Sequence, residues 1–188
     1  YGVNRIKYEK IDKLSNFAYF PLQIQPESSI DAFTNIYDNQ INTIKLISRN
    51  LPNGMTLVVK DHPVFYGRRS PSYLIKISNI PNVKLVSHKE NNFNLLNKMK
   101  VLFSINGSVL WEAAYLKKPA IVLGDNRMAE LLPNVIKLNS INLIYETTKE
   151  VMSKNLNNAD YDKLILNYLI STLDVNFPAK FTGFSRKS

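Results

Sequence analysis

The chain has 188 residues, of which 45% are hydrophobic and 21% charged, so it can bury a core and is not disordered in bulk. It has no cysteine and two histidines, which excludes a disulfide and a thiolate metal site and argues against a multi-histidine metal centre. We therefore expect neither a metal nor a cofactor. No apolar run approaches the roughly 20 residues that a membrane span requires. The chain begins at Tyr1 with sequence typical of the middle of a protein, and we expect it to be a segment of a longer chain.

The formal net charge is +9, from 24 basic and 15 acidic residues. Such a balance occurs in proteins that bind nucleic acid, an anionic membrane or small anionic substrates, and also in proteins with a solvated lysine-rich surface. The lysines are scattered and form no basic stripe with interleaved aromatic residues, so we expect no nucleic-acid partner. The absence of cysteine fits a cytoplasmic protein, and a basic face would suit peripheral contact with an anionic inner membrane.

In the first half of the chain, short apolar runs alternate with amphipathic segments. Residues 1–16 are polar and weakly patterned, and we interpret them as a linker or disordered lead-in. Residues 17–24 form the first predicted strand, in which Pro21 favours an edge position or a bulge. Residues 36–51 have the apolar spacing of a helix. The further elements predicted in this half are a strand at 55–59, a loop at 64–69, a helix at 71–77, a strand at 83–86 and a helix at 92–98.

Residues 101–125, with the sequence VLFSINGSVLWEAAYLKKPAIVLGD, predict a complete βαβ unit. Its parts are a strand at 101–103, a polar turn at 104–108, a helix at 109–116 and a strand at 120–123. Ser108 is placed to cap the helix and Pro119 to end it. The turn therefore lies at the carboxyl end of a parallel strand and the amino end of a helix. There, unpaired N–H groups and the helix dipole favour an anion.

Beyond Asp125 the pattern weakens but continues. The predicted elements are a helical turn at 128–132, a strand at 135–138, a helix at 141–155, and a last helix from Asp160 with Tyr161, Leu164, Ile165, Tyr168 and Leu169 on one face. The alternation of strands and helices predicts an α/β fold, a Rossmann-like three-layer domain with a parallel sheet covered on both faces. We assign this domain to residues 17–175 and a basic tail to 176–188.

Polar side chains follow several predicted strands, and the carboxyl ends of parallel strands meet at one edge of the sheet. His62 directly follows a strand and can donate a hydrogen bond to a phosphate; alternatively, it bonds a carbonyl in an ordinary turn. The second candidate is the turn formed by Ser104, Asn106, Gly107 and Ser108. Its N–H groups and hydroxyls would hold an anion; alternatively, the turn is a plain helix cap.

Two further sets of residues are candidates for the same cleft. Glu112 lies one turn into the predicted helix and would hydrogen-bond the two ribose hydroxyls of a nucleotide; alternatively, it stabilises the helix dipole. Gln25, Glu27 and Ser28 follow the first predicted strand and would face the cleft; alternatively, they are ordinary polar residues of a loop.

Other ligand classes are disfavoured because their motifs are missing. The sequence has no P-loop, no GxGxxG and no nucleophile triad, and the loop after the first strand lacks the glycines that a dinucleotide pyrophosphate needs. ATP and NAD are therefore disfavoured, and a nucleotide-sugar phosphate is favoured. We expect Trp111 in the core rather than under a base, and a structural role for His88.

Three stretches together resemble one known family. They are QPESS at 25–29, VVKDHP at 58–63 and SINGSVLWEAAYLKKPAIVLGD at 104–125. In this order and spacing they resemble the capsule polysaccharide biosynthesis family of bacterial GT-B glycosyltransferases, which includes the β-Kdo transferases of capsule linkers. The resemblance covers roughly residues 17–130. Related HP and serine motifs occur in sialyltransferases and polysialyltransferases, which use CMP-sugars, and in CDP-glycerol polymerases.

The resemblance implies that the chain is the C-terminal, donor-binding half of a GT-B enzyme, whose N-terminal half would be a missing partner domain. By position, the donor phosphate would be held by His62, Ser104, Asn106, Gly107 and Ser108. Glu112 would hold the ribose, and Lys60 would offset phosphate charge. The catalytic acid or base of such enzymes usually comes from the N-terminal half, so Glu27 and Asp61 are the only catalytic candidates in this cleft.

The expected function is transfer of a sugar from a CMP-activated donor, such as CMP-Kdo, to a saccharide or lipid-linked acceptor. The protein would stabilise the leaving nucleotide phosphate electrostatically. Three alternatives stay open: a CDP-glycerol or UDP-sugar transferase, a sugar-nucleotide epimerase, or a non-catalytic module that binds a nucleotide or acts as a scaffold. An epimerase would need acid and base groups in both halves of its cleft, and this half has few.

Overall fold

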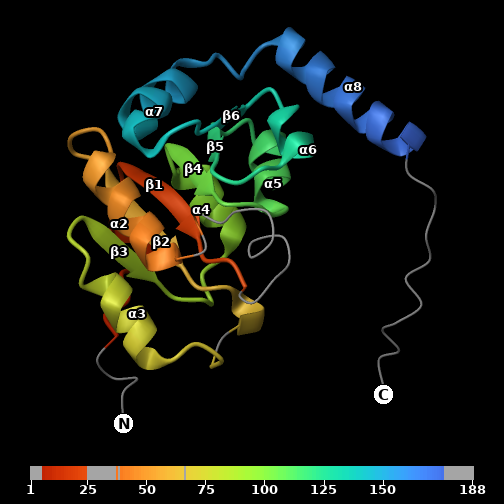
Figure 1. Cartoon of the computed structure of the whole chain (residues 1–188). Helices are drawn as coiled ribbons and strands as arrows, with labels where there is room; N and C mark the ends of the chain where they lie inside the picture. Colours follow the sequence, from red (N-terminus) through yellow and green to blue (C-terminus); the bar gives the residue numbers. More distant parts are fainter. Residues whose placement is uncertain (1–5, 25–36, 38, 66, 176–188) are drawn as a thin grey trace, which may run out of the picture.

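The computed structural model describes residues 6–24, 37, 39–65 and 67–175 (Figure 1). Its centre is a six-stranded, all-parallel sheet with the order β3-β2-β1-β4-β5-β6. The strands are β1 Phe17–Pro21, β2 Thr56–Lys60, β3 Val83–Val86, β4 Val101–Ser104, β5 Ala120–Val122 and β6 Val135–Lys137. This is the strand order of the doubly wound nucleotide-binding fold, and it confirms the α/β, Rossmann-like architecture.

Helices cover both faces of the sheet (Figure 1). The α-helices are α2 Gln40–Asn50, α3 Pro71–Ser78, α4 Asn92–Lys98, α5 Val109–Tyr115, α6 Arg127–Glu130, α7 Ile144–Ser153 and α8 Ala159–Val175. Short 3-10 turns are η2 Ile11–Lys13, η3 Pro63–Phe65 and η4 Ile141–Leu143. Helices α2, α3 and α7 contribute to the core on one face, and α4, α5 and α6 to the core on the other. None of the described helices is both long and apolar enough to cross a bilayer.

The strands are buried on both faces because their residues alternate between the two cores. In β1, Ala18 and Phe20 join the core under α2, whereas Phe17 and Tyr19 join the core under α4 and α5. Continuous apolar runs of four or five residues are typical of such doubly covered parallel strands. Burial continues to the end of β2 and one residue beyond it, because Lys60 and Asp61 are also buried.

Pro21 occupies a central strand, so the expected edge position is wrong. It is the last residue of β1, where it pairs with Lys60, and the next N–H, that of Leu22, donates to the Lys60 carbonyl at 2.9 Å. A proline costs little there because the strand ends with it. The predicted extension of this strand to residue 24 is therefore not observed.

At both ends of the domain, the packing of the described residues differs from what the sequence predicted. Within the predicted lead-in, the Glu9 N–H donates to the Leu85 carbonyl at 2.8 Å and Ile11 is buried, so this segment packs beside β3. In α8, Leu164 is exposed, whereas Tyr161 is buried. Only a narrow side of α8 contacts the rest of the domain, because the helix lies beside α5 and is not covered by a second layer (Figure 1). The predicted tail 176–188 and position 36 lie outside the described residues.

We expect Phe103→Ala to lower the free energy of unfolding by about 3–5 kcal/mol, because Phe103 is fully buried in β4 and the truncation leaves a cavity. The matched control is Phe93→Ala on α4, where the ring is 53% exposed and the loss should stay within about 0.5 kcal/mol. Urea unfolding of both variants measures the difference. Equal losses would contradict the assigned core.

Candidate functional site

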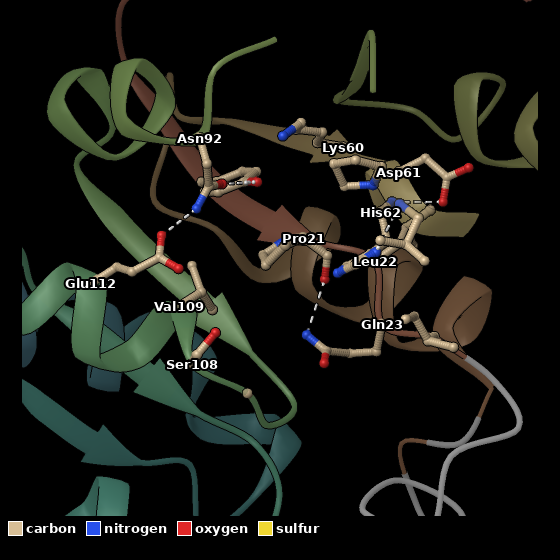
Figure 2. A pocket seen from close by; sticks show the side chains of 15 residues that line it. Pro21, Leu22, Gln23, Lys60, Asp61, His62, Asn92, Ser108, Val109 and Glu112 are labelled. Atoms are coloured by element: carbon tan, nitrogen blue, oxygen red, sulfur yellow. Dashed lines mark hydrogen bonds between the residues drawn. The ribbon is translucent and has the colours of Figure 1, made fainter. Parts of the chain in front are cut away.

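A cavity of about 400 Å³ lies at the carboxyl ends of the central strands (Figure 2). The lining residues are Tyr19 and 21–24 from β1 and its exit, 60–64 from β2 and its exit, Asn92 from α4, and 107–109 and Glu112 from the start of α5. The cavity therefore lies between β1 and β4, where the strand order reverses. Ligands of open α/β sheets bind at this switch point.

The turn between β4 and α5 forms one wall. Gly107 has a φ of +108°, a conformation that other residues rarely adopt, and a Cβ there would lie 3.3 Å from Gln23 Oε1. Ser108 is at the predicted N-cap position, but its side chain makes no capping hydrogen bond. Both residues line the cavity, as the sequence predicted.

Ser104 and Asn106 support this turn from behind and do not line the cavity. The Ser104 hydroxyl, fully buried, donates to the Asn106 carbonyl at 2.6 Å. Asn106 Oδ1 accepts the Gly107 N–H at 2.9 Å and also a hydrogen bond from Asn126 Nδ2. Their place in the structure is thus that of groups that shape the turn.

Lys60 and His62 bring positive charge and hydrogen-bond donors to the opposite wall. Lys60 is 5% exposed, and within the described part of the chain no hydrogen bond or ion pair to its ammonium is found. Burial lowers the pKa of Lys60, while Glu112 and Glu90 oppose that shift. His62 Nδ1 accepts the Val64 N–H at 3.3 Å, so a neutral ring carries its proton on Nε2 and can donate there.

Asp61 forms a buried ion pair with Arg69. Asp61 Oδ1 lies 2.8 Å from Arg69 Nε, with side-chain exposures of 3% and 6%, and it also accepts the His62 N–H at 2.8 Å. The guanidinium lies over the rings of Phe65 and Tyr73, at 4.9 and 5.2 Å from their centroids. These contacts fix the loop that carries His62.

The exit of β1 is clamped by two buried side chains. Gln40, the first residue of α2, accepts the Gln23 N–H at 2.8 Å and donates to the Gln23 carbonyl at 3.1 Å. Arg69 Nη2 donates to the same carbonyl. Arg69 therefore links the exits of β1 and β2, two of the segments that line the cavity. The Gln23 side chain turns toward the Gly107 turn.

Glu112 is held by a chain of hydrogen bonds that crosses three elements. The Tyr19 hydroxyl donates to Asn92 Oδ1 at 2.8 Å, and Asn92 Nδ2 donates to Glu112 Oε2 at 2.5 Å (Figure 2). Burial, together with the charge of Glu112, raises the pKa of Tyr19 far above its ordinary value. Tyr19 therefore remains a protonated donor at neutral pH.

The structure brings six predicted residues into one cavity: Lys60, Asp61, His62, Gly107, Ser108 and Glu112. Gln25, Glu27 and Ser28 lie outside the described residues. No group of three or more metal-ligating side chains occurs in the part of the chain that the structure describes. Trp111 is partly buried against the core and its Nε1 donates to the Tyr168 hydroxyl at 2.8 Å, so its expected core position is confirmed.

Sequence reasoning missed four residues that build or line the site: Tyr19, Gln23, Asn92 and Arg69. Tyr19 sits inside an apolar strand, where its hydroxyl gives no signal. Asn92 looks like part of a helix start, and Asn91 does accept the Phe93 N–H at 2.8 Å. Arg69 was visible only as one of two adjacent arginines in a loop.

The fold and site define the chain as a Rossmann-like α/β domain with a ligand cleft at the switch point. The family model described as "Capsule polysaccharide biosynthesis protein" matches residues 2–130. The chain belongs to the capsule polysaccharide biosynthesis protein family. No protein of curated function matches it by sequence.

Solved structures with the same fold include enzymes that act on nucleotide sugars. The UDP-GlcNAc 2-epimerase of Methanocaldococcus jannaschii matches with a TM-score of 0.56 and 17% identity, over 90% of this chain and 48% of that one. The S. aureus MnaA–UDP structure matches with a TM-score of 0.54 and 16% identity, over 95% and 51%.

Spinosyn rhamnosyltransferase SpnG in complex with spinosyn aglycone gives a TM-score of 0.54 and 13% identity, over 85% of this chain and 45% of that one. The chain thus spans about half the length of these structures. At these identities the likeness establishes the fold, a Rossmann-like domain of the kind found in one half of GT-B glycosyltransferases.

We expect Arg69→Met to lower the free energy of unfolding by about 3–5 kcal/mol, because it leaves the buried Asp61 carboxylate without its partner. The matched control is Lys98→Met, which breaks an exposed pair with Asp12 whose side chains are 44% and 87% exposed; its cost should be about 0–1 kcal/mol. Urea unfolding compares the two. A small loss at Arg69 would mean that water or another group can replace the guanidinium.

Proposed function

We propose that this chain is the donor-binding domain of a glycosyltransferase that uses a nucleotide-activated sugar, with CMP-Kdo as the expected type of donor. One observation carries the proposal. Lys60 is a buried cation without an ion pair among the described residues, and it faces the same cavity as the Glu112 carboxylate. A buried charge normally has a partner. A nucleotide would supply a phosphate for Lys60 and ribose hydroxyls for Glu112.

The phosphate would lie between the β2 exit and the Gly107 turn. Lys60, His62 Nε2 and the Ser108 hydroxyl line this space and can all donate to phosphate oxygens. Ser104 and Asn106, proposed earlier as phosphate ligands, would act by shaping the turn. Glu112 would accept from the ribose.

In the reaction, the bond between the sugar carbon and the phosphate oxygen breaks, and the electron pair leaves with the nucleotide phosphate. The acceptor hydroxyl forms the new bond and loses its proton to a base. Positive charge and fixed donors stabilise the phosphate as its negative charge develops. Asp61 suits this base poorly, because Arg69 and the His62 N–H both engage its Oδ1; Glu27 stays a proposal outside the described residues.

A second candidate is a sugar-nucleotide epimerase or a UDP-sugar transferase. It is supported by the structural neighbours, which include UDP-GlcNAc 2-epimerase and a UDP complex of MnaA. The donor base is therefore the first property to test. CDP-glycerol transfer would also release CMP, because glycerol phosphate is the group transferred, so product analysis with each donor separates that alternative.

We expect CMP to raise the melting temperature of the full protein more than CDP, UDP, GDP or ADP does. A ligand at 100 times its Kd adds about 2.7 kcal/mol of stability when it binds only the folded state. Thermal shift with each nucleotide measures this. Selective stabilisation by UDP or CDP would favour the second candidate, and no shift with any nucleotide would overturn nucleotide binding.

We expect Lys60→Met to weaken CMP binding about tenfold or more, because a charge-assisted hydrogen bond is lost. The same change should raise the urea midpoint of the ligand-free protein, because it removes a buried charge without a partner. Since burial lowers the pKa of Lys60, CMP affinity should fall as the pH rises through that pKa, where the ammonium loses its proton.

The control for Lys60→Met is Lys76→Met, which removes one positive charge from an exposed position on α3. It should leave both CMP affinity and the urea midpoint unchanged. Isothermal titration and urea unfolding measure the two properties. A lower midpoint for Lys60→Met with unchanged CMP affinity would contradict the assignment of Lys60 to the ligand.

A further inference from the structure

The chain of hydrogen bonds from Tyr19 through Asn92 to Glu112 has a defined direction. An asparagine side chain has one accepting end and one donating end. Tyr19 is 1% exposed and keeps its proton, so its hydroxyl donates to Asn92 Oδ1. The Glu112 carboxylate can only accept, so the NH₂ group of Asn92 points at Oε2, at 2.5 Å. The buried Tyr19 hydroxyl holds the amide in this orientation by donating to its other end.

The direction determines what Glu112 presents to the cavity. Oε2 accepts from the Asn92 NH₂ group, and this contact holds the carboxylate in place. Within the described residues, no other hydrogen bond or ion pair to the Glu112 carboxylate is found, and Lys60 attracts it without forming an ion pair. Glu112 lines the cavity, so it offers accepting oxygens to groups that donate, such as a pair of neighbouring hydroxyls.

The local sequence makes Asn92 available for this role. Two asparagines stand at the start of α4, and Asn91 is the N-cap that accepts the Phe93 N–H. Asn92 is the first helical residue, and its side chain turns into the cavity between β1 and α5 (Figure 2). The cap and the cavity group are therefore separate residues.

We propose that Asn92, held in place by Tyr19, is a positioning residue that holds Glu112 as a ribose acceptor and makes the site select ribonucleotides over 2′-deoxyribonucleotides. The inference rests on the proposed nucleotide binding. Beyond nucleotide binding, it names Asn92 and Tyr19 as the residues behind the selectivity, which is measured as the ratio of the affinities for CMP and dCMP. A ligand without the 2′-hydroxyl loses one hydrogen bond to a charged acceptor, which corresponds to about a tenfold or greater loss of affinity.

The test measures the affinities of the full protein for CMP and dCMP by isothermal titration. We expect the wild type to bind CMP at least about tenfold more tightly than dCMP. Asn92→Asp has nearly the same shape but replaces the donating NH₂ by an oxygen, so it repels the Glu112 carboxylate. Its preference for CMP should fall to about two-fold or less, because Glu112 leaves its position.

Two variants make the result specific. Asn91→Asp is the same substitution one residue earlier, at a cap that aspartate fills equally well, and it should keep the wild-type ratio. Tyr19→Phe removes only the hydroxyl that orients Asn92, so the ratio should fall severalfold even if Asn92→Asp folds poorly. Urea midpoints of all variants identify any that are merely unfolded.

The outcomes separate this inference from the proposed function. A wild type that binds CMP and dCMP equally would overturn the inference and leave nucleotide binding intact. Equal losses of CMP and dCMP affinity in Asn92→Asp, with the ratio unchanged, would show a purely structural role and also overturn it. A wild type that binds neither nucleotide would overturn the proposed function itself.

Discussion

The buried guanidinium of Arg69 is the contact on which the shape of the cleft depends. It joins the Asp61 carboxylate after β2 to the Gln23 carbonyl after β1, and it lies over the rings of Phe65 and Tyr73. Two strand exits that would otherwise be independent loops therefore keep one relative position. A buried ion pair adds little net stability compared with apolar packing. Its value here is geometric, because the planar donor group holds both partners at fixed angles.

Lys60 directly precedes Asp61 in the chain and is also buried. Its charge is placed very differently from that of Arg69. Arg69 has a carboxylate, a carbonyl and two rings as partners, whereas no ion pair to Lys60 is found among the described residues. The end of β2 and the loop that follows it thus contain one cation that is paired within the fold and one that is not. Charges of the second kind are expected where a ligand completes the site, at some cost to the stability of the empty protein.

The sequence was most informative where local chemistry decides structure. The strand at 83–86 and the helix at 92–98 were predicted with their observed bounds, because short apolar runs and turn residues mark both ends. His62 and Glu112 were placed together because the carboxyl ends of parallel strands must meet. Asn92 and Tyr19 were missed because only tertiary packing brings them to Glu112. The edge position expected from Pro21 failed because the rule concerns strand interiors, and Pro21 ends its strand.

The two described carboxylates in the cavity lining suggest how the chemistry is divided. Asp61 is engaged by Arg69 and the His62 N–H, and Glu112 is engaged by Asn92. A general base needs a carboxylate oxygen that can reach the proton of the acceptor, and donors from the protein already engage one oxygen of each of these groups. Under the proposed function, the described lining would therefore hold the nucleotide and stabilise its departure. Activation of the acceptor would then depend on groups beyond these residues, which agrees with a chain that spans about half the length of its structural neighbours.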